Sequence, residues 1–215
     1  MTDHPRTILE QGLETLGLKA TATQCDQMMA LLDLVVEWNQ KINLTAITEP
    51  VAMVQKHLLD SLTVQPWLKG PFVIDVGTGA GFPGLPLAIL NPSLRFTLLD
   101  STGKKIRFVE HVIQSVGLPE VTAVCVRAEH FKPEQRAATV VSRALSTIPE
   151  FIRYAGHMVS KNGTLLAMKG KDPAAELSNL PPQWRLLGVE PLTVPGLSDQ
   201  RHLARIARVL LDAPV

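Results

Sequence analysis

The hydrophobic pattern changes character near residue 68. Before that point, apolar residues recur at steps of three and four, the spacing of amphipathic helices. Three helices are predicted in this region. The first runs from Pro5 to Leu16, the second follows an N-cap at Thr23, and the third begins at Pro50. Beyond residue 68, short β-branched runs alternate with helical stretches. The pattern therefore predicts a helical extension over residues 1–68, packed on a domain that spans residues 69–215.

The second region contains a regular alternation of predicted strands and helices. Strands are predicted at 72–76, 95–100, 121–126, 139–143 and 163–168, with two more inside 184–194 and 202–211. Helices are predicted at 83–91, 102–116 and 148–159. Strands that alternate with helices indicate an α/β fold with a doubly wound, mostly parallel sheet. The ligand crevice of such a sheet lies at the carboxyl ends of its strands.

Composition narrows the class of protein. Of the 215 residues, 46% are hydrophobic and 19% are charged, which is typical of a folded globular protein. A net charge of +1 gives no general affinity for nucleic acid, so any RNA contact must come from a local basic patch. Two cysteines are too few for a disulfide framework or a zinc site, and we predict no metal. We see no signal-peptide pattern and no apolar run of about 20 residues, and we predict a cytoplasmic protein.

A glycine-rich segment follows the first strand of the second region. Gly77, Gly79, Gly81 and Gly84 lie between that strand and the next helix, and Asp75 precedes them. Such a loop lets backbone N–H groups approach a ligand without interference from Cβ atoms. The next strand ends in a second acid, Asp100. Two carboxylates at neighbouring strand tips suit a ligand with an amine and a ribose, and S-adenosylmethionine has both.

A dinucleotide site is the main alternative for this loop. Residues 79–84 fit the pattern G-x-G-x-x-G, and Asp100 lies at about the distance expected of a ribose partner. A dinucleotide strand, however, runs almost directly into the first glycine of that pattern. Here residues 75–78 intervene and give the form D-x-G-x-G-x-G, which favours the methyl donor.

Other polar residues also fall at predicted strand tips. Ala128 and Glu129 follow the third strand, and Arg143 ends the fourth, so they converge with the two acids on one crevice. In the helical region His57, Asp60 and Ser61 share one predicted helical face. One helix cannot give these three the geometry of a catalytic triad. A hydrogen-bonded structural cluster is the favoured interpretation, and a contribution to the substrate cleft is the alternative.

Eight motifs are spread along the whole chain: WNQKINLT at 38–45, KHLLDSL at 56–62, DVGTGAGFPGLPLA at 75–88, LLDSTGKKIRF at 98–108, RAE at 127–129, VSRAL at 141–145, MKGK at 168–171 and RHL at 201–203. Through these motifs the whole chain resembles the RsmG (GidB) family of bacterial 16S ribosomal RNA guanine-N7 methyltransferases. The resemblance implies a seven-stranded sheet of the class I S-adenosylmethionine-dependent type with an N-terminal helical extension. It implies donor contacts at Gly77, Phe82, Asp100, Ser101, Thr102, Ala128, Glu129 and Arg143, to which our reading of the loop adds Asp75, Gly79 and Gly81.

The chemistry implied by that family does not need a base. Guanine N7 has a free in-plane lone pair and carries no proton, so it can attack the methyl group directly, and catalysis rests on alignment. Arg143 would hold either the donor or the guanine edge. Candidates for contacts to the RNA backbone are Lys104, Lys105, Arg107, Lys169, Lys171, Arg201 and His202. The alternatives at this stage are an NAD-dependent oxidoreductase and a non-catalytic regulator that binds the donor.

Overall fold

The computed structural model describes residues 4–143, 146–178 and 180–209. The last two residues of the predicted strand at 202–211, and Ala144 and Leu145 of the motif at 141–145, lie outside the described residues. In the described part of the chain, no helix is long and apolar enough to cross a membrane.

The N-terminal region is helical, as predicted. It contains α1 (Pro5–Thr15), α2 (Ala22–Asn39), α3 (Pro50–Met53), the π-helical segment η1 (Val54–Leu59), α4 (Asp60–Leu62) and the turn η2 (Gln65–Trp67). Thr21, not Thr23, caps α2, because Thr21 and Gln24 form a reciprocal capping box. Asn39 ends this helix, since its side-chain oxygen accepts the N–H groups of Leu44 and Thr45 and turns the chain.

The second region forms one seven-stranded sheet in the order β3-β2-β1-β4-β5-β7-β6. Its strands are β1 (Phe72–Val76), β2 (Arg95–Asp100), β3 (Val121–Cys125), β4 (Ala137–Arg143), β5 (Val159–Lys169), β6 (Trp184–Leu192) and β7 (Arg201–Arg208). The first five strands pair in parallel, whereas β7 runs antiparallel to both β5 and β6. The predicted mostly parallel sheet is confirmed. A dinucleotide fold in the usual order 3-2-1-4-5-6 lacks the antiparallel strand between β5 and β6.

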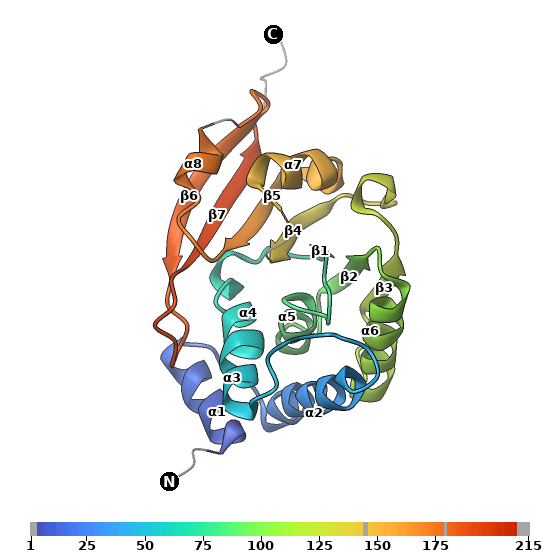
Figure 1. Cartoon of the computed structure of the whole chain (residues 1–215). Coiled ribbons are helices and arrows are strands. Elements are labelled where there is room, and N and C mark those ends of the chain that lie inside the picture. The colour runs from blue at the N-terminus through green and yellow to red at the C-terminus, as the bar shows by residue number, and fades with distance from the viewer. Residues whose placement is uncertain (1–3, 144–145, 179, 210–215) are drawn as a thin grey trace.

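Helices cover both faces of this sheet (Figure 1). They are α5 (Gly84–Leu90), α6 (Gly103–Val116), α7 (Ile148–Ala155) and α8 (Ala174–Leu177), with short turns η3 (Ala128–His130) and η4 (Gly156–Met158). Alternate strand residues face opposite layers: Val73 packs with the N-terminal helices, α5 and α6, and Ile74 packs with α7. Helix α7 ends at Ala155 rather than 159, because Val159 already pairs with Ala137 in the sheet.

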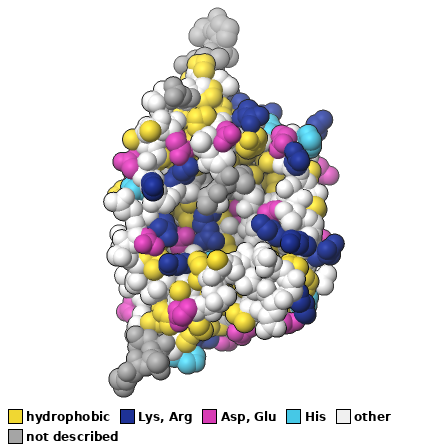
Figure 2. All heavy atoms as spheres, in the orientation of Figure 1, with side chains coloured by type: hydrophobic (Ala, Val, Ile, Leu, Met, Phe, Trp, Pro, Cys, Tyr) yellow, Lys and Arg dark blue, Asp and Glu magenta, His cyan; other side chains and the backbone are white. Residues whose placement is uncertain are grey.

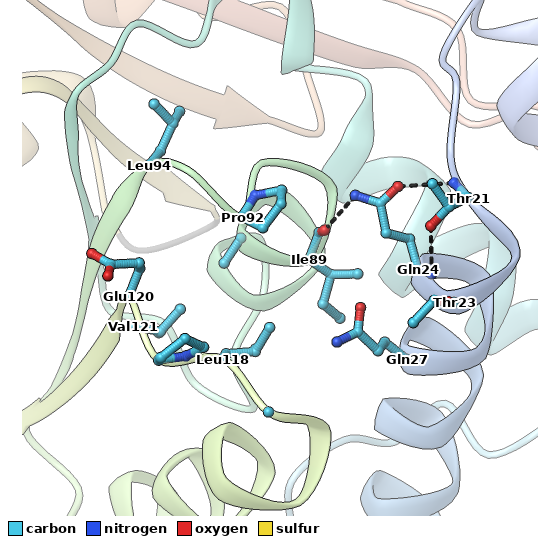
Figure 3. A pocket seen from close by; sticks show the side chains of 13 residues that line it. Thr21, Thr23, Gln24, Gln27, Ile89, Pro92, Leu94, Leu118, Glu120 and Val121 are labelled. Atoms are coloured by element: carbon cyan, nitrogen blue, oxygen red, sulfur yellow. Dashed lines mark hydrogen bonds between the residues drawn. The ribbon is translucent and has the colours of Figure 1, made fainter.

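The side chains of Gln24 and Gln27 connect α2 to the sheet domain, and Figure 3 shows the hydrogen bond from Gln24 to Ile89. The Gln24 amide donates to the carbonyl oxygens of Ile89 and Leu90 at the end of α5, at 2.8 and 3.2 Å, and Gln27 donates to Val116 at the end of α6, at 2.9 Å. These carbonyls have no partner inside their own helices, so the amides satisfy them. A pocket of about 310 Å³ lies beside the glutamines, at the amino ends of the strands. The helical extension thus shares one hydrophobic cluster with the sheet. The domain boundary at residues 68–69 stays a prediction.

Candidate active site at the strand tips

A crevice of about 610 Å³ opens at the carboxyl ends of β1, β2 and β3. Six of the predicted donor-binding residues line it: Gly77, Asp100, Ser101, Thr102, Ala128 and Glu129. Its remaining walls come from Val76, Leu99, Lys105, Val126, Arg127, Ser146, Glu150 and Tyr154. The structure therefore brings together residues from three strand tips and the start of α7, as the order of the parallel sheet requires.

The glycine loop is held against β2 by Asp100. Gly77, Gly79 and Gly81 have φ values of 72°, 60° and 88°, in the left-handed region that favours glycine. One oxygen of Asp100 accepts the Gly79 N–H at 3.0 Å, and the other accepts the Thr102 N–H at 2.8 Å. Each oxygen can accept a further hydrogen bond, so Asp100 can hold the loop and also contact a ligand in the crevice.

Asp75 lies beneath the same loop and is fully buried. Its Oδ2 accepts the Thr78 hydroxyl at 2.6 Å and the Gly84 N–H at 2.9 Å, which ties the two ends of the loop together. Its Oδ1 is buried with no partner in the described part of the chain. Burial raises the pKa of Asp75 to about 6, although the two hydrogen bonds act in the opposite direction. Asp75 does not line the crevice; Gly79, Gly81 and Phe82 also lie outside its lining.

A second polar cluster lies where α4 meets the ends of β4 and β7. Asp60 is buried, with 6% of its side chain exposed, and accepts Arg143 Nη1 on Oδ2 at 3.0 Å and Arg201 Nε on Oδ1 at 3.2 Å. Arg143 also donates to the Lys56 carbonyl at 2.9 Å, and its guanidinium lies 5.4 Å from the centre of the Phe82 ring. A single carboxylate therefore links two arginines that are 58 positions apart in the sequence.

His57 packs on the glycine loop rather than on its helical neighbours. Its ring stacks on Phe82, with centroids 4.6 Å apart, and its Nε2 lies 3.0 Å from the Thr45 hydroxyl. Ser61 donates to the His57 backbone carbonyl, so the side chains of His57, Asp60 and Ser61 each bind different partners. Burial, and secondly the charge of Arg143, lower the pKa of His57 to about 4. The ring is therefore neutral near pH 7. In the described part of the chain, the predicted cluster is reduced to the Ser61–His57 hydrogen bond, because Asp60 binds two arginines instead.

Comparison with known proteins decides the family. The GidB family, described as rRNA small subunit methyltransferase G, matches residues 24–204. The chain belongs to the GidB family. Proteins named ribosomal RNA small subunit methyltransferase G resemble it closely: that of Aeromonas salmonicida is 45% identical over 90% of this chain and 93% of its own length. That of Chromohalobacter salexigens is 44% identical over 97% of this chain and 100% of its own length.

Solved structures agree on the fold. TrmN from Thermus thermophilus superimposes with a TM-score of 0.57 at 18% identity, covering 80% of this chain and 52% of its own. Coclaurine N-methyltransferase, solved with N-methylheliamine and SAH, gives 0.57 at 13% identity over 88% of this chain and 73% of its own. The class I methyltransferase fold is thus confirmed. The GidB family is a family of methyltransferases, so the oxidoreductase and non-catalytic alternatives are not retained.

The basic residues predicted to contact RNA in this GidB-family chain occupy several environments. Lys105 lines the crevice, and Lys104, Arg107 and Lys171 are exposed. Lys169, by contrast, donates to the Ser146 carbonyl at 2.9 Å and pairs with Glu176 at 2.8 Å. Arg201 belongs to the Asp60 cluster, and His202 is partly buried in β7. Figure 2 shows Lys and Arg side chains gathered across the middle of one face, with acidic side chains beside some of them.

Two basic residues near the site were missed by the sequence reasoning. Arg127 is exposed and lines the crevice. Its place directly before the Ala128–Glu129 pair was a usable signal, because the whole tip of β3 faces the crevice. Lys56 lies 3.9 Å from Asp199 at the edge of the Asp60 cluster, and its carbonyl holds Arg143. Lys56 begins the motif at 56–62, but the sequence pattern gave it no role, since its contacts come from distant parts of the chain.

Proposed function

We propose that this protein transfers a methyl group from S-adenosylmethionine to N7 of a guanine in 16S ribosomal RNA of the small ribosomal subunit. One observation carries the proposal. A chain of the GidB family has a crevice of about 610 Å³ between Asp100, the β3 tip and a loop whose glycines have positive φ values. The names of the relatives support small-subunit rRNA as the substrate. A ribosomal substrate also supports action in the cytoplasm.

We expect the crevice to hold the donor. Among the described residues, a Cβ built on Gly79 would meet no atom closer than 4.0 Å, so there is open space beside this glycine. Asp100 would accept the ribose hydroxyls, and Ala128 and Glu129 would border the adenine. Ser101 and Thr102 would complete the wall at the start of α6. Asp75 would act from below, by holding the loop in the shape that the donor contacts.

The reaction then depends on holding guanine N7, the methyl group and the donor sulfur in line. S-adenosylmethionine supplies a methyl group activated by its bond to a positively charged sulfur. Guanine N7 attacks with its lone pair, and no proton leaves the nucleophile, so the protein must position the base and exclude misaligned approaches. His57 is poorly suited to act as a base, because its pKa is about 4, its ring is buried and its Nε2 bonds with Thr45.

Arg143 is proposed to orient the RNA rather than to contact N7. A hydrogen bond from an arginine to N7 would occupy the lone pair that must attack the methyl group. A contact to O6 or to a phosphate leaves that lone pair free. The guanidinium is already anchored to Asp60, Lys56 and the Phe82 face, which places it beside the loop and outside the lining of the donor crevice.

The test measures transfer of a tritiated methyl group to three acceptors: assembled small subunits from cells that lack this protein, naked 16S RNA, and GMP. We expect transfer to at least one of the two RNA acceptors, none to GMP, and 7-methylguanosine in the nucleoside digest by mass spectrometry. The near-neutral net charge implies that shape and a local basic surface select the RNA. Equal turnover of GMP, or a different methylated nucleoside, would contradict the proposal.

A further inference from the structure

The Asp60 cluster assembles its members from three distant parts of the chain. Asp60 comes from α4, Arg143 from the end of β4 and Arg201 from the start of β7. Asp199 extends the cluster, because its Oδ2 lies 3.7 Å from Arg201 Nη2 and 3.9 Å from Lys56 Nζ. Three basic side chains and two acidic ones leave the cluster with a net positive charge.

The geometry fixes the two arginines without burying them. Asp60 is nearly inaccessible, with 6% of its side chain exposed, whereas Arg143 and Arg201 keep 20% and 22% exposed. Among the described residues, the recorded hydrogen bonds of Arg143 engage only Nη1. A guanidinium carries five N–H groups in a planar fork, so Arg143 retains donors for an anion. Such forks bind phosphate oxygens two at a time.

We propose that Asp60 is a positioning residue that holds Arg143 and Arg201 side by side as a receptor for one backbone phosphate of the acceptor RNA. The inference rests on the proposed function and deepens it. A phosphate fits better than a second carboxylate-bearing protein because the cluster lies beside the glycine loop, where the target nucleotide must enter. Arg143 reaches that loop directly, through its contact with the Phe82 ring.

Asp60→Asn is the sharpest variant. An amide has nearly the volume of the carboxylate, but it offers one acceptor oxygen and one NH₂ group in place of two acceptor oxygens. It can therefore keep one arginine and must repel the other. Asp33→Asn is the matched control, because Asp33 is exposed on α2 and takes part in none of the ion pairs recorded in the described part of the chain.

The first experiment measures initial rates of methylation of small subunits taken from cells that lack this protein, together with calorimetric binding of S-adenosylmethionine. We expect Asp60→Asn to raise the KM for subunits about tenfold, the scale of one lost charge-assisted hydrogen bond, and to leave kcat within about threefold. The Kd for S-adenosylmethionine should stay within about twofold of the value for the unmodified chain. Asp33→Asn should leave KM, kcat and Kd all unchanged. A merely structural role for Asp60 would lower the melting temperature without this separation of constants.

A double-variant cycle tests whether Asp60 acts through the arginines. In an Arg201→Gln background, Asp60→Asn should add less than about threefold to the KM, because the arginine that it displaces is already gone. Arg143→Gln should in addition make the slope of log KM against log salt shallower by about one, as expected for a phosphate contact. The inference would be overturned if the KM effects of Asp60→Asn and Arg201→Gln multiplied in the double variant. It would also be overturned if Arg143→Gln left the salt slope unchanged.

The outcomes separate the two proposals. If the unmodified chain transfers no methyl group to either RNA acceptor, the proposed function fails, and this inference fails with it. If it does transfer, but Asp60→Asn leaves the subunit KM unchanged or weakens the donor equally, the inference alone is wrong. Should Asp60→Asn fold poorly, Arg201→Lys provides the same test, because it keeps the charge but loses the fork, and a KM unchanged in that variant would overturn the inference.

Discussion

Two acid-centred clusters meet at the Phe82 ring, and they are built in opposite ways. The glycine-loop cluster takes Asp75, Thr78, Gly84 and Asp100 from a stretch of 26 residues and forms around backbone N–H groups. The Asp60 cluster joins side chains that are 83 and 141 positions apart and forms around guanidinium groups. Three of the four donors in the first cluster are backbone N–H groups, and the fourth is the Thr78 hydroxyl, so neighbours in the chain build it. The second depends on the correct packing of α4 against two strand ends.

This difference has an electrostatic counterpart. Burial raises the pKa of Asp75 to about 6, and its hydrogen-bond donors in the described part of the chain, Thr78 and Gly84, are neutral. Burial, and secondly the charge of Arg143, lower the pKa of the buried His57 beside the Asp60 cluster to about 4. Burial thus disfavours the charged form of both side chains, and the charge of Arg143 adds to this effect at His57. The four predictions below test the comparison, from the largest expected effect to the smallest.

Gly84→Ala should break the glycine-loop cluster. A Cβ at this position would lie 2.7 Å from Asp75 Oδ2 and 2.9 Å from Leu98 Cγ, both in the buried core. We expect a loss of about 3 kcal/mol in the free energy of unfolding, the upper end of the usual overpacking cost. Denaturant melts measure it, and Gly170→Ala is the control because no atom of the described residues lies within 4 Å of its Cβ position. Equal stability of the two variants would contradict the geometry of the loop.

Asp100→Asn should weaken the donor without unfolding the chain. The amide keeps one acceptor oxygen, so it cannot serve the Gly79 N–H, the Thr102 N–H and a ribose hydroxyl as the carboxylate can. Calorimetry should show a loss of roughly 1–3 kcal/mol in S-adenosylmethionine binding, the cost of leaving buried polar groups unpaired. Asp33→Asn again provides the charge-matched control. Unchanged donor affinity in Asp100→Asn would remove Asp100 from the proposed site.

The two buried titrating groups should give stability opposite slopes with pH. The pKa of Asp75 is raised in the folded state, so the folded chain binds the extra proton and its stability rises as pH falls from about 6 to 4. The pKa of His57 is lowered, so the unfolded chain binds the extra proton and stability falls as pH drops from about 6.5 to 4. In the native chain these contributions oppose each other.

Single variants should reveal each slope. His57→Gln should gain roughly 1–2 kcal/mol relative to the native chain on going from pH 6.5 to 4.5, and Asp75→Asn should lose a similar amount. Urea melts of the three proteins at both pH values measure these differences. If both variants shift in the same direction, the assignment of one of the two groups is wrong.

The smallest expected effect is on the chemical step. Because N7 loses no proton, the rate of single-turnover methyl transfer should stay flat between about pH 6.5 and 8.5, a range that spans the upper part of an ordinary histidine titration. His57→Gln should change stability before it changes this rate. A steep rise of the rate with pH that His57→Gln abolishes, with folding and binding intact, would restore a general base to the mechanism.

Much of the fold followed from the sequence alone. The β-branched runs, the prolines that open helices and the alternation of strand and helix predicted the sheet, because each of these signals acts through neighbours in the chain. The errors concerned where elements begin and end. Thr21 rather than Thr23 caps α2, since Gln24 completes its capping box, and β5 begins at Val159 because its pairing with β4 overrides the helical pattern before it.

The candidate donor crevice was predictable for a related reason. In a parallel sheet every strand tip faces the same edge, so a residue's position at the end of a strand gives its place in the crevice. That rule brought Gly77, Asp100 and Ala128 together correctly, and applied one residue earlier it would have found Arg127. It overreached with Asp75, whose side chain turns under the loop to satisfy the Thr78 hydroxyl and the Gly84 N–H.

Only the tertiary structure decided what Asp60, His57 and Arg143 do. On one helix, His57 and Asp60 looked like partners. In the fold, His57 stacks on Phe82 and Asp60 holds Arg143 and Arg201. The physical reason is that a buried carboxylate takes whichever cations the packing brings within reach, and those cations come from strand ends that no local pattern connects to α4. The sequence by itself determined the elements and the ligand edge of the sheet, and the packing of distant elements determined the charges around it.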